Sequence, residues 1–337
     1  MNIKVSKAYL ADMAKAKKNL TKGDLPLNYD SLALKYASTL GTVSQQEEAS
    51  ALLRDIANYR AIKGELRLAS EDYTHLLDHK YEVNEIGASL LGLVEQLSEG
   101  LKTPPLVALI RNRYLDPDLK RRASEALICT ARELSNKGLY AEAGSCYKSL
   151  INYRQSTEQA DTELLGLIGR VSPLEDVKIL SLVANFSCFT SPKERALDLF
   201  LDVSSHLVAE SKPINEADEN VLGIIWKGLR LVVEQTEGSS IEKAKEIVLS
   251  GQDCSWDRTS ALSSLLQKGY LEVASVLWEI ASSEEGAARL ALGYLVRHLP
   301  VDHELWDEQG LIALLKRCWG SEDPQLYHYL ERVQAKG

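Results

Sequence analysis

Asp72, His75 and His79 are the residues of this chain whose types and spacing best suit a metal site. They lie three and four residues apart in the segment EDYTHLLDHK, so their side chains would point the same way from an α-helix. A carboxylate and two imidazoles are common zinc ligands. Tyr73 and Leu76 already give the same helix a packing stripe, which favours a plain polar face over a metal site.

A second group of this kind, His298, Asp302 and His303, crosses a proline turn in RHLPVDHELW. Asp302 is better explained as the cap of the helix that follows it. The chain also lacks the P-loop, dinucleotide-binding, HExxH, GxSxG and EF-hand patterns. We therefore expect a non-enzymatic protein without catalytic residues, metal ligands or a cofactor. A metal-dependent, all-helical enzyme that uses the first group is the alternative.

Positive charge is concentrated between residues 111 and 122, in the segment IRNRYLDPDLKRRASEAL. The basic residues of this 111–122 cluster are Arg111, Arg113, Lys120, Arg121 and Arg122. Asp116 and Asp118 interrupt it, whereas a nucleic-acid surface combines a denser basic patch with aromatic side chains. The net charge of the chain is −9, which also argues against a protein whose main role is to bind a nucleic-acid phosphate backbone. We expect a solvated helix face or a docking point for an acidic partner, with a nucleic-acid-associated subunit as the alternative.

The sequence carries no signal peptide pattern and no apolar run of membrane-spanning length. Its five cysteines are far apart, and no two have the CxxC spacing. Such cysteines are typical of reduced thiols in a cytosolic protein. We expect a cytoplasmic protein with no membrane partner.

The composition favours helices, because Leu, Ala and Glu are abundant and no alternating β-branched run is long enough for a sheet. Helix starts are predicted by four Ser-x-x-Glu capping boxes and by Asp116-Pro117. The four boxes begin at Ser44, Ser172, Ser191 and Ser239. Many helices of modest length with short turns indicate a bundle or a solenoid, and an internal repeat distinguishes between them.

Three segments align around a glycine: LLRDIANYRAIKGELRLASEDYTHLL, LICTARELSNKGLYAEAGSCYKSL and RTSALSSLLQKGYLEVASVLWEIA. The shared positions are a first-helix residue (Ala57, Ala131, Leu262), the glycine (Gly64, Gly138, Gly269), a small residue (Ala69, Ala143, Ala274), an aromatic residue (Tyr73, Tyr147, Trp278) and a final stripe residue (Leu76, Leu150, Ala281). The glycine can adopt the left-handed conformation that ends the first helix. The small residue then lets the two helices approach closely.

This order of residues resembles the tetratricopeptide repeat. The glycines are 74 and 131 residues apart, near two and four times the family's period of about 34 residues. The segment EGSSIEKAKEIVL, with Ala244, is a candidate for a degenerate unit. The chain departs from the family in lacking its closing proline and its first-helix aromatic residue. The resemblance implies an all-α, right-handed α-α superhelix (solenoid), with a HEAT-like array or a compact helical bundle as the alternatives.

On this basis we predict four segments. Residues 1–30 form an N-terminal capping helix, residues 31–155 form helical repeats, residues 156–235 form degenerate repeats, and residues 236–337 form C-terminal repeats with a Trp-rich cap. All five tryptophans lie in the last part of the chain, after residue 220. We favour a packing role for them over a partner site.

The resemblance also implies a function: a non-catalytic adaptor or scaffold that binds another protein or a peptide segment, with acidic segments among the candidates. In the family, ligands contact polar positions of the first helix of each unit. Carried over to this chain, these positions are Arg54 and Asn58, Arg132 and Asn136, and Thr259, Ser263 and Gln267. An arginine and an asparagine one turn apart could hold a carboxylate. We expect Arg54, Asn58, Arg132 and Asn136 to line one concave face.

Overall fold

The structure, a computed structural model, describes residues 7–22, 32–210, 216–283, 287–300, 303 and 314. These residues form sixteen α-helices and one short 3₁₀ helix, and none of them lies in a strand. The predicted all-α class is therefore confirmed. None of the helices in these ranges is both long and apolar enough to cross a membrane.

The chain divides into two compact units, residues Met1–Arg170 and Val171–Gly337. The first unit contains α1 (Lys7–Thr21), α2 (Leu32–Leu40), α3 (Val43–Ile62), α4 (Leu66–Asp78), α5 (Val83–Val94), α6 (Glu99–Arg111), α7 (Pro117–Asn136), α8 (Tyr140–Asn152) and α9 (Glu158–Leu165). The second contains α10 (Pro173–Phe186), α11 (Thr190–Glu210), α12 (Glu216–Gln235), α13 (Ser239–Ser250), α14 (Trp256–Gln267), the 3₁₀ helix η1 (Leu271–Val273), α15 (Ala274–Ser282) and α16 (Ala288–His298).

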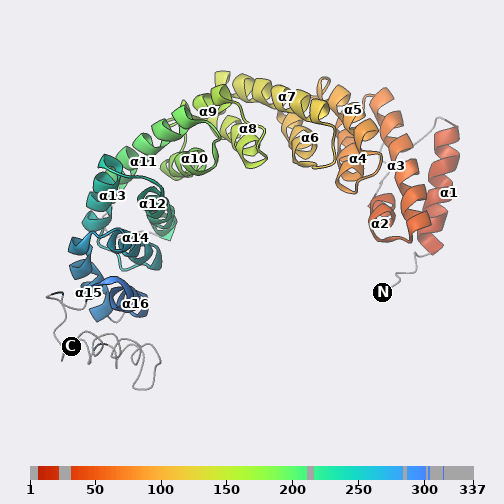
Figure 1. The fold of residues 1–337 in the computed structure, drawn as a ribbon. Helices are drawn as coiled ribbons and strands as arrows, with labels where there is room; N and C mark the ends of the chain where they lie inside the picture. The colour runs from red at the N-terminus through yellow and green to blue at the C-terminus, as the bar shows by residue number, and fades with distance from the viewer. Residues whose placement is uncertain are drawn as a thin grey trace. The chain divides into compact units, whose positions relative to one another are not determined.

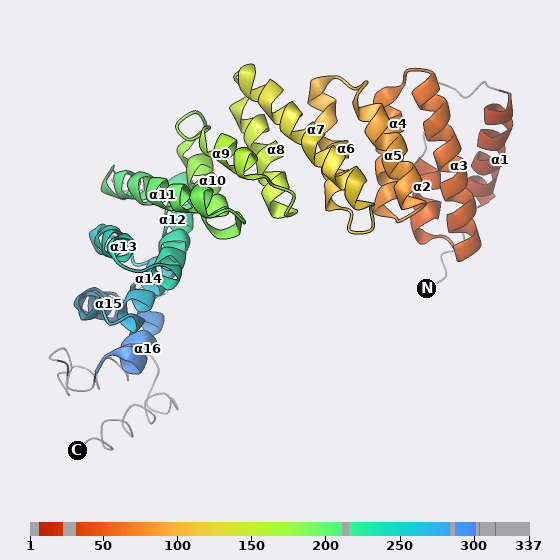
Figure 2. The same ribbon diagram turned by 45° about the horizontal axis from the view of Figure 1, so that its top comes forward.

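In the first unit each helix packs against its neighbours in the sequence, and alternate helices also touch. Figure 1 shows α3, α5 and α7 in one layer and α4, α6 and α8 in a second, and Figure 2 shows the same helices following one another along the unit. Contacts run between the layers and also along them, from α4 to α6, from α6 to α8 and from α5 to α7. This sequential packing is that of a helical array, because short turns make neighbouring helices antiparallel.

In the second unit, one pair of alternate helices, α12 and α14, packs as extensively as the successive helices α10 and α11. The closest neighbours are α10 with α11, α12 with α14, and α15 with α16, and α10 also touches α12. Trp226 is 1% exposed and anchors this packing from α12. Its indole N–H donates to the Asp253 carboxylate at 3.1 Å. Trp306 and Trp319 lie outside the described residues.

The three aligned segments form the helix pairs that the repeat predicts, α3 with α4, α7 with α8, and α14 with η1 and α15. Their glycines have positive φ angles: 79° at Gly64, 78° at Gly138 and 94° at Gly269. In each turn the residue after the glycine donates its N–H to the carbonyl five residues earlier, at 2.9–3.1 Å. This bond is the signature of a Schellman helix end, so the role of the glycines is confirmed.

The small residues of the repeat lie at helix contacts. Ala69, Ala143 and Ala274 are each 0% exposed. Tyr73 and Tyr147 are buried one turn later, while Trp278 is half-buried. A larger side chain at these alanines would have to displace the neighbouring helix.

Candidate functional site

The first predicted metal ligand, Asp72, is part of a buried ion-pair cluster. Its carboxylate is 0% exposed and contacts the guanidinium of Arg60, which is 2% exposed, and the ammonium of Lys35 at 2.8 Å. Glu65 lies 3.7 Å from Arg60 Nε. The Asp72 carboxylate therefore contacts two cations, and these contacts link α4 to α2 and to α3.

His75 and His79 hold α2 against α4. His75 Nε2 lies 2.8 Å from Ser38 Oγ, and His79 Nε2 lies 3.1 Å from Thr39 Oγ1. Both hydroxyls donate to the carbonyl of Lys35, so each accepts a hydrogen bond from its imidazole. Burial, then the nearby His79 and Lys35, lower the pKa of His75 to about 4. Among the residues that the structure describes, no group of three or more His, Cys, Asp and Glu side chains could hold a metal ion.

In the first repeat, the predicted binding residues both have partners inside the chain. Arg54 is one-third exposed, and its guanidinium pairs with the carboxylate of Glu82, at the start of α5, at 2.6 Å. The amide oxygen of Asn58 accepts a hydrogen bond from the hydroxyl of Tyr73 at 2.5 Å. A partner's carboxylate would have to compete with Glu82 for Arg54.

In the second repeat, Arg132 forms an ion pair with the carboxylate of Glu163 on α9. Its Nε and Nη2 atoms donate at 2.8–3.1 Å, and the hydroxyl of Tyr147 donates to the same carboxylate at 2.7 Å. Burial raises the pKa of Glu163, but the hydrogen bonds from Arg132 and Tyr147 outweigh it and lower the pKa overall. Asn136 is exposed.

In the third repeat, two of the three predicted residues are buried. Thr259 is 0% and Ser263 2% exposed. The hydroxyl of Thr259 donates to the Ser255 carbonyl at 2.8 Å, whereas Ser263 Oγ has no hydrogen-bond partner. Gln267 is exposed, and its amide lies 3.2 Å from Nε2 of His298. Only Gln267 of this set presents its side chain to solvent.

The 111–122 cluster is partly neutralised by neighbouring carboxylates. Arg111 pairs with Asp78 at 2.6 Å, and Arg121 pairs with both Asp118 and Glu125 at 2.6 and 2.7 Å. Arg113 instead lies against the ring of Tyr114. Arg111 and Arg121 are therefore engaged by carboxylates of the chain itself.

The first unit has a groove between α4 and α6, two helices of one layer. It has a volume of about 360 Å³. The α4–α6 groove is lined by Arg67, Ser70, Glu71, Thr74, Leu97, Leu101, Pro104 and Pro105. Pro104 and Pro105 lie inside α6 and have no N–H, so the carbonyls of Gly100 and Leu101 lose their helical donors.

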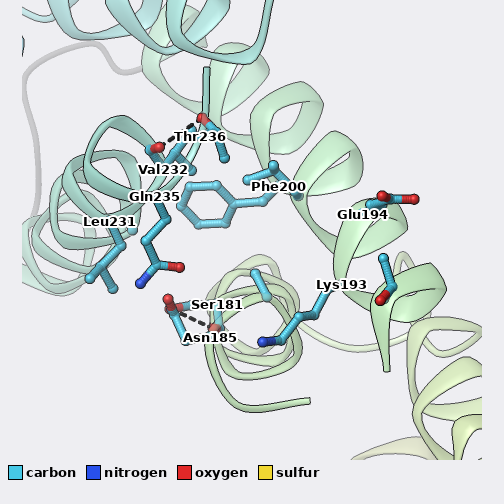
Figure 3. A pocket seen from close by; sticks show the side chains of 13 residues that line it. Ser181, Asn185, Lys193, Glu194, Phe200, Leu231, Val232, Gln235 and Thr236 are labelled. Carbon is cyan, nitrogen blue, oxygen red and sulfur yellow. Dashed lines mark hydrogen bonds between the residues drawn. The ribbon is translucent and has the colours of Figure 1, made fainter. Parts of the chain in front are cut away.

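The second unit has a pocket between α10, α11 and α12, with a volume of about 240 Å³. We call it the α10–α12 groove (Figure 3). It is lined by Ser181, Ala184, Asn185, Thr190, Lys193, Glu194, Leu197, Phe200, Gly228, Leu231, Val232, Gln235 and Thr236. A Cβ atom at Gly228 would lie 2.2 Å from Phe200 Cζ, so this glycine makes room for the Phe200 ring.

Polar side chains surround the apolar interior of the α10–α12 groove. Asn185 donates to the Ser181 carbonyl at 2.7 Å, and Thr236 donates to the Val232 carbonyl at 2.8 Å. Within the described part of the chain, Lys193, Glu194 and Gln235 make no side-chain hydrogen bond or ion pair. An ammonium, a carboxylate and an amide are therefore available to a ligand.

Comparisons with models of protein families, with curated proteins and with solved structures found no match to this chain.

Proposed function

We propose that the chain is a non-catalytic scaffold that binds a peptide segment of another protein in the grooves between alternate helices. The observation that carries this proposal is the α10–α12 groove, which joins an apolar interior around Phe200 to the unpaired Lys193, Glu194 and Gln235. Apolar pockets with a few convergent polar groups are the usual form of a binding site.

The size of this groove favours a peptide over a small-molecule substrate. Its volume of about 240 Å³ is below the range of about 300–1,000 Å³ that holds a whole drug-sized ligand. It suits one or two apolar side chains of a longer segment. The amide of Gln235 can bond to the backbone of that segment, and the charged groups of Lys193 and Glu194 can select its flanking residues.

The helical array supports the same proposal. The helix pairs α3 with α4 and α7 with α8 resemble tetratricopeptide units, and we propose that the array is a degenerate solenoid of this kind. Solenoids present long surfaces for protein ligands. We further propose that the protein acts in the cytoplasm and needs no cofactor.

The test is a peptide-display selection on the purified chain, followed by affinity measurements with the selected peptides. Ala184→Trp fills the α10–α12 groove and should weaken binding at least tenfold. Arg195→Trp, an exposed position of α11 outside the groove, is the matched control and should leave affinity within twofold. Gln235→Ala should weaken binding without changing stability. Peptides whose affinity is indifferent to Ala184→Trp would refute this site.

A further inference from the structure

The turns after α4, α6 and α8 follow one another along one edge of the first unit, because α4 packs against α6 and α6 against α8. The amide of Asn112 donates to the Leu77 carbonyl at 2.8 Å and so ties the turn after α6 to the end of α4. At this junction the ammonium of Lys80 and the guanidinium of Arg113 each lie 4.8 Å from the ring centre of Tyr114. Two cations therefore converge on one aromatic ring.

The hydroxyl of Tyr114 is part of the same cluster. The nearby Lys80, and after it Arg113, lower the pKa of the Tyr114 hydroxyl. Tyr114 is 49% exposed, so solvent reaches the ring and the two cations. An incoming anion would meet an ammonium, a guanidinium and a hydroxyl at one place.

The edge continues to the turn after α8. Arg111, at the end of α6, pairs with Asp78 at 2.6 Å, and α6 packs against α8. The pKa of Arg111 is raised mainly by Asp78 and, to a smaller extent, by Tyr153. Tyr153 is 39% exposed, and Arg154 follows it. We call Lys80, Arg113, Tyr114, Tyr153 and Arg154 the basic edge.

Lys80 and Arg154 occupy the same position of the repeat, sixteen residues after Gly64 and Gly138 respectively. Both have left-handed backbone conformations, with φ of 61° at Lys80 and 56° at Arg154. Glycine is the usual residue at such a helix end because it has no Cβ atom to clash with the backbone there, and asparagine is the common exception. A basic residue therefore stands at the same strained position in both repeats. Helix termination alone does not require a basic residue there.

The cations of the basic edge have no acidic partner among the residues that the structure describes. Among residues 32–210, Lys80, Arg113 and Arg154 form no ion pair. The chain holds 48 Asp and Glu against 39 Lys and Arg. Carboxylates within the chain therefore outnumber its cations, and yet these three cations are left without an ion pair. We propose that the basic edge binds an acidic segment of a partner protein.

An acidic peptide fits this edge better than a nucleic acid does. Asp78, Glu82 and Asp116 interrupt the basic residues along the turns of the edge, whereas a nucleic-acid backbone is bound by a denser run of positive charge. Cations already lie against the ring of Tyr114, where a base would have to stack. Separate carboxylates can instead meet Lys80 and Arg113 one at a time, while the tyrosines supply contact area.

The experiment measures fluorescence anisotropy of a labelled peptide of alternating Glu and Gly residues, about twelve residues long, with the full chain at low salt. The same peptide with Gln for Glu is the charge control, and an oligothymidine of equal length tests the nucleic-acid alternative. Lys80→Glu/Arg113→Glu is the test variant. Lys63→Glu is the matched control, because its ammonium also lies over a tyrosine, 5.5 Å from the Tyr59 ring centre, outside the basic edge.

We expect the acidic peptide to bind in a salt-dependent manner and the double variant to weaken it at least tenfold, with Lys63→Glu within twofold of the unchanged chain. Equal losses in the two variants, no binding of the acidic peptide, or tighter binding of the oligothymidine with the same dependence on Lys80 and Arg113 would each overturn the proposal. Ala184→Trp should not affect this affinity, so failure here is distinguishable from failure of the groove proposal.

Discussion

Arg60 on α3 and Asp72 on α4 form an ion pair in the interior of the first unit, where their side chains are 2% and 0% exposed. Lys35 on α2 contacts the same carboxylate at 2.8 Å. Three helices therefore meet at one carboxylate. Because a buried charge is costly without its partner, the pair specifies how these helices pack.

Removal of one member of this pair should destabilise the first unit strongly. Arg60→Met leaves Asp72 with less compensation, and Asp72→Leu leaves Arg60 buried without its carboxylate, so each should cost about 3–5 kcal/mol. The double variant should cost less than the sum of the two. All five tryptophans lie after residue 220, so a urea transition seen by circular dichroism but not by tryptophan fluorescence reports the first unit. Additive losses in the double variant would contradict a coupled pair.

The stability of the first unit should fall as the pH is lowered from about 6.5 towards 4. The pKa of His75 is about 4 in the folded chain and about 6.5 in an unfolded one. Between these values the unfolded chain binds the extra proton, so acid favours unfolding, and the contribution is fully present only above about pH 6.5. The groups facing His75 are His79, Lys35 and Asp72.

Thermal unfolding across this pH range provides the measurement, with His75→Gln as the comparison. The variant should lose less stability than the unchanged chain between pH 6.5 and 4, because it carries no group at this position that titrates there. Parallel curves for the two proteins would show that His75 does not titrate as inferred.

The helix pairs could be predicted from the sequence because glycine, alanine and tyrosine act within one hairpin of about 25 residues. Two helix starts were also predicted correctly: Asp116 accepts from the Asp118 N–H at 2.8 Å, and Ser172 accepts from the Glu175 N–H at 3.3 Å. The helix start predicted at Ser44 is wrong, because Thr42 caps α3. The N–H of Thr42 donates to the side-chain oxygen of Gln45 at 2.9 Å. Thr42 with Gln45 is an overlapping capping box two residues ahead of the predicted one.

Two other predicted starts were also wrong. Helix α11 begins at Thr190, before Ser191. Gly238, with a φ of 69°, precedes α13 in place of Ser239. Glycine is accepted at a helix cap and can take conformations that serine resists, so the serine pattern alone did not identify the residue.

Overpacking of the repeat contacts should destabilise the protein. Ala69→Leu and Ala143→Leu each place three additional carbon atoms at a position that is 0% exposed, at a cost of about 1–3 kcal/mol. Gly138→Val should also cost stability, because a β-branched residue resists a φ of 78°. Chemical denaturation measures these effects, with Ala141→Leu on the exposed side of α8 as the control. Unchanged stability in Ala143→Leu would show that α7 and α8 do not pack as tightly as inferred.

Lys80→Gly and Arg154→Gly should affect stability and binding in opposite directions. Glycine relieves the left-handed strain, so each variant should be as stable as the unchanged chain or more stable by up to about 1 kcal/mol. Both should bind the Glu-Gly peptide more weakly. Thermal unfolding and anisotropy on the same samples test this pair of effects, and a variant that is less stable yet binds normally would contradict it.

The binding surfaces could not be predicted from the sequence in the same way. Arg54 and Arg132 were chosen for their place on a first helix, but their partners Glu82 and Glu163 lie 28 and 31 residues away. No local pattern indicates such pairs. The α10–α12 groove likewise joins Ser181 to Thr236 across three helices, and the room for Phe200 depends on Gly228, which has no motif of its own.

Hydrogen–deuterium exchange of the full chain, with and without a peptide selected by display, tests the central claim most directly. Binding in the α10–α12 groove predicts new protection in residues 181–200 and 228–236, with Ala184→Trp removing it and Arg195→Trp retaining it. Protection confined to other helices, or protection that persists unchanged in Ala184→Trp, would contradict the claim that this groove is the peptide-binding site.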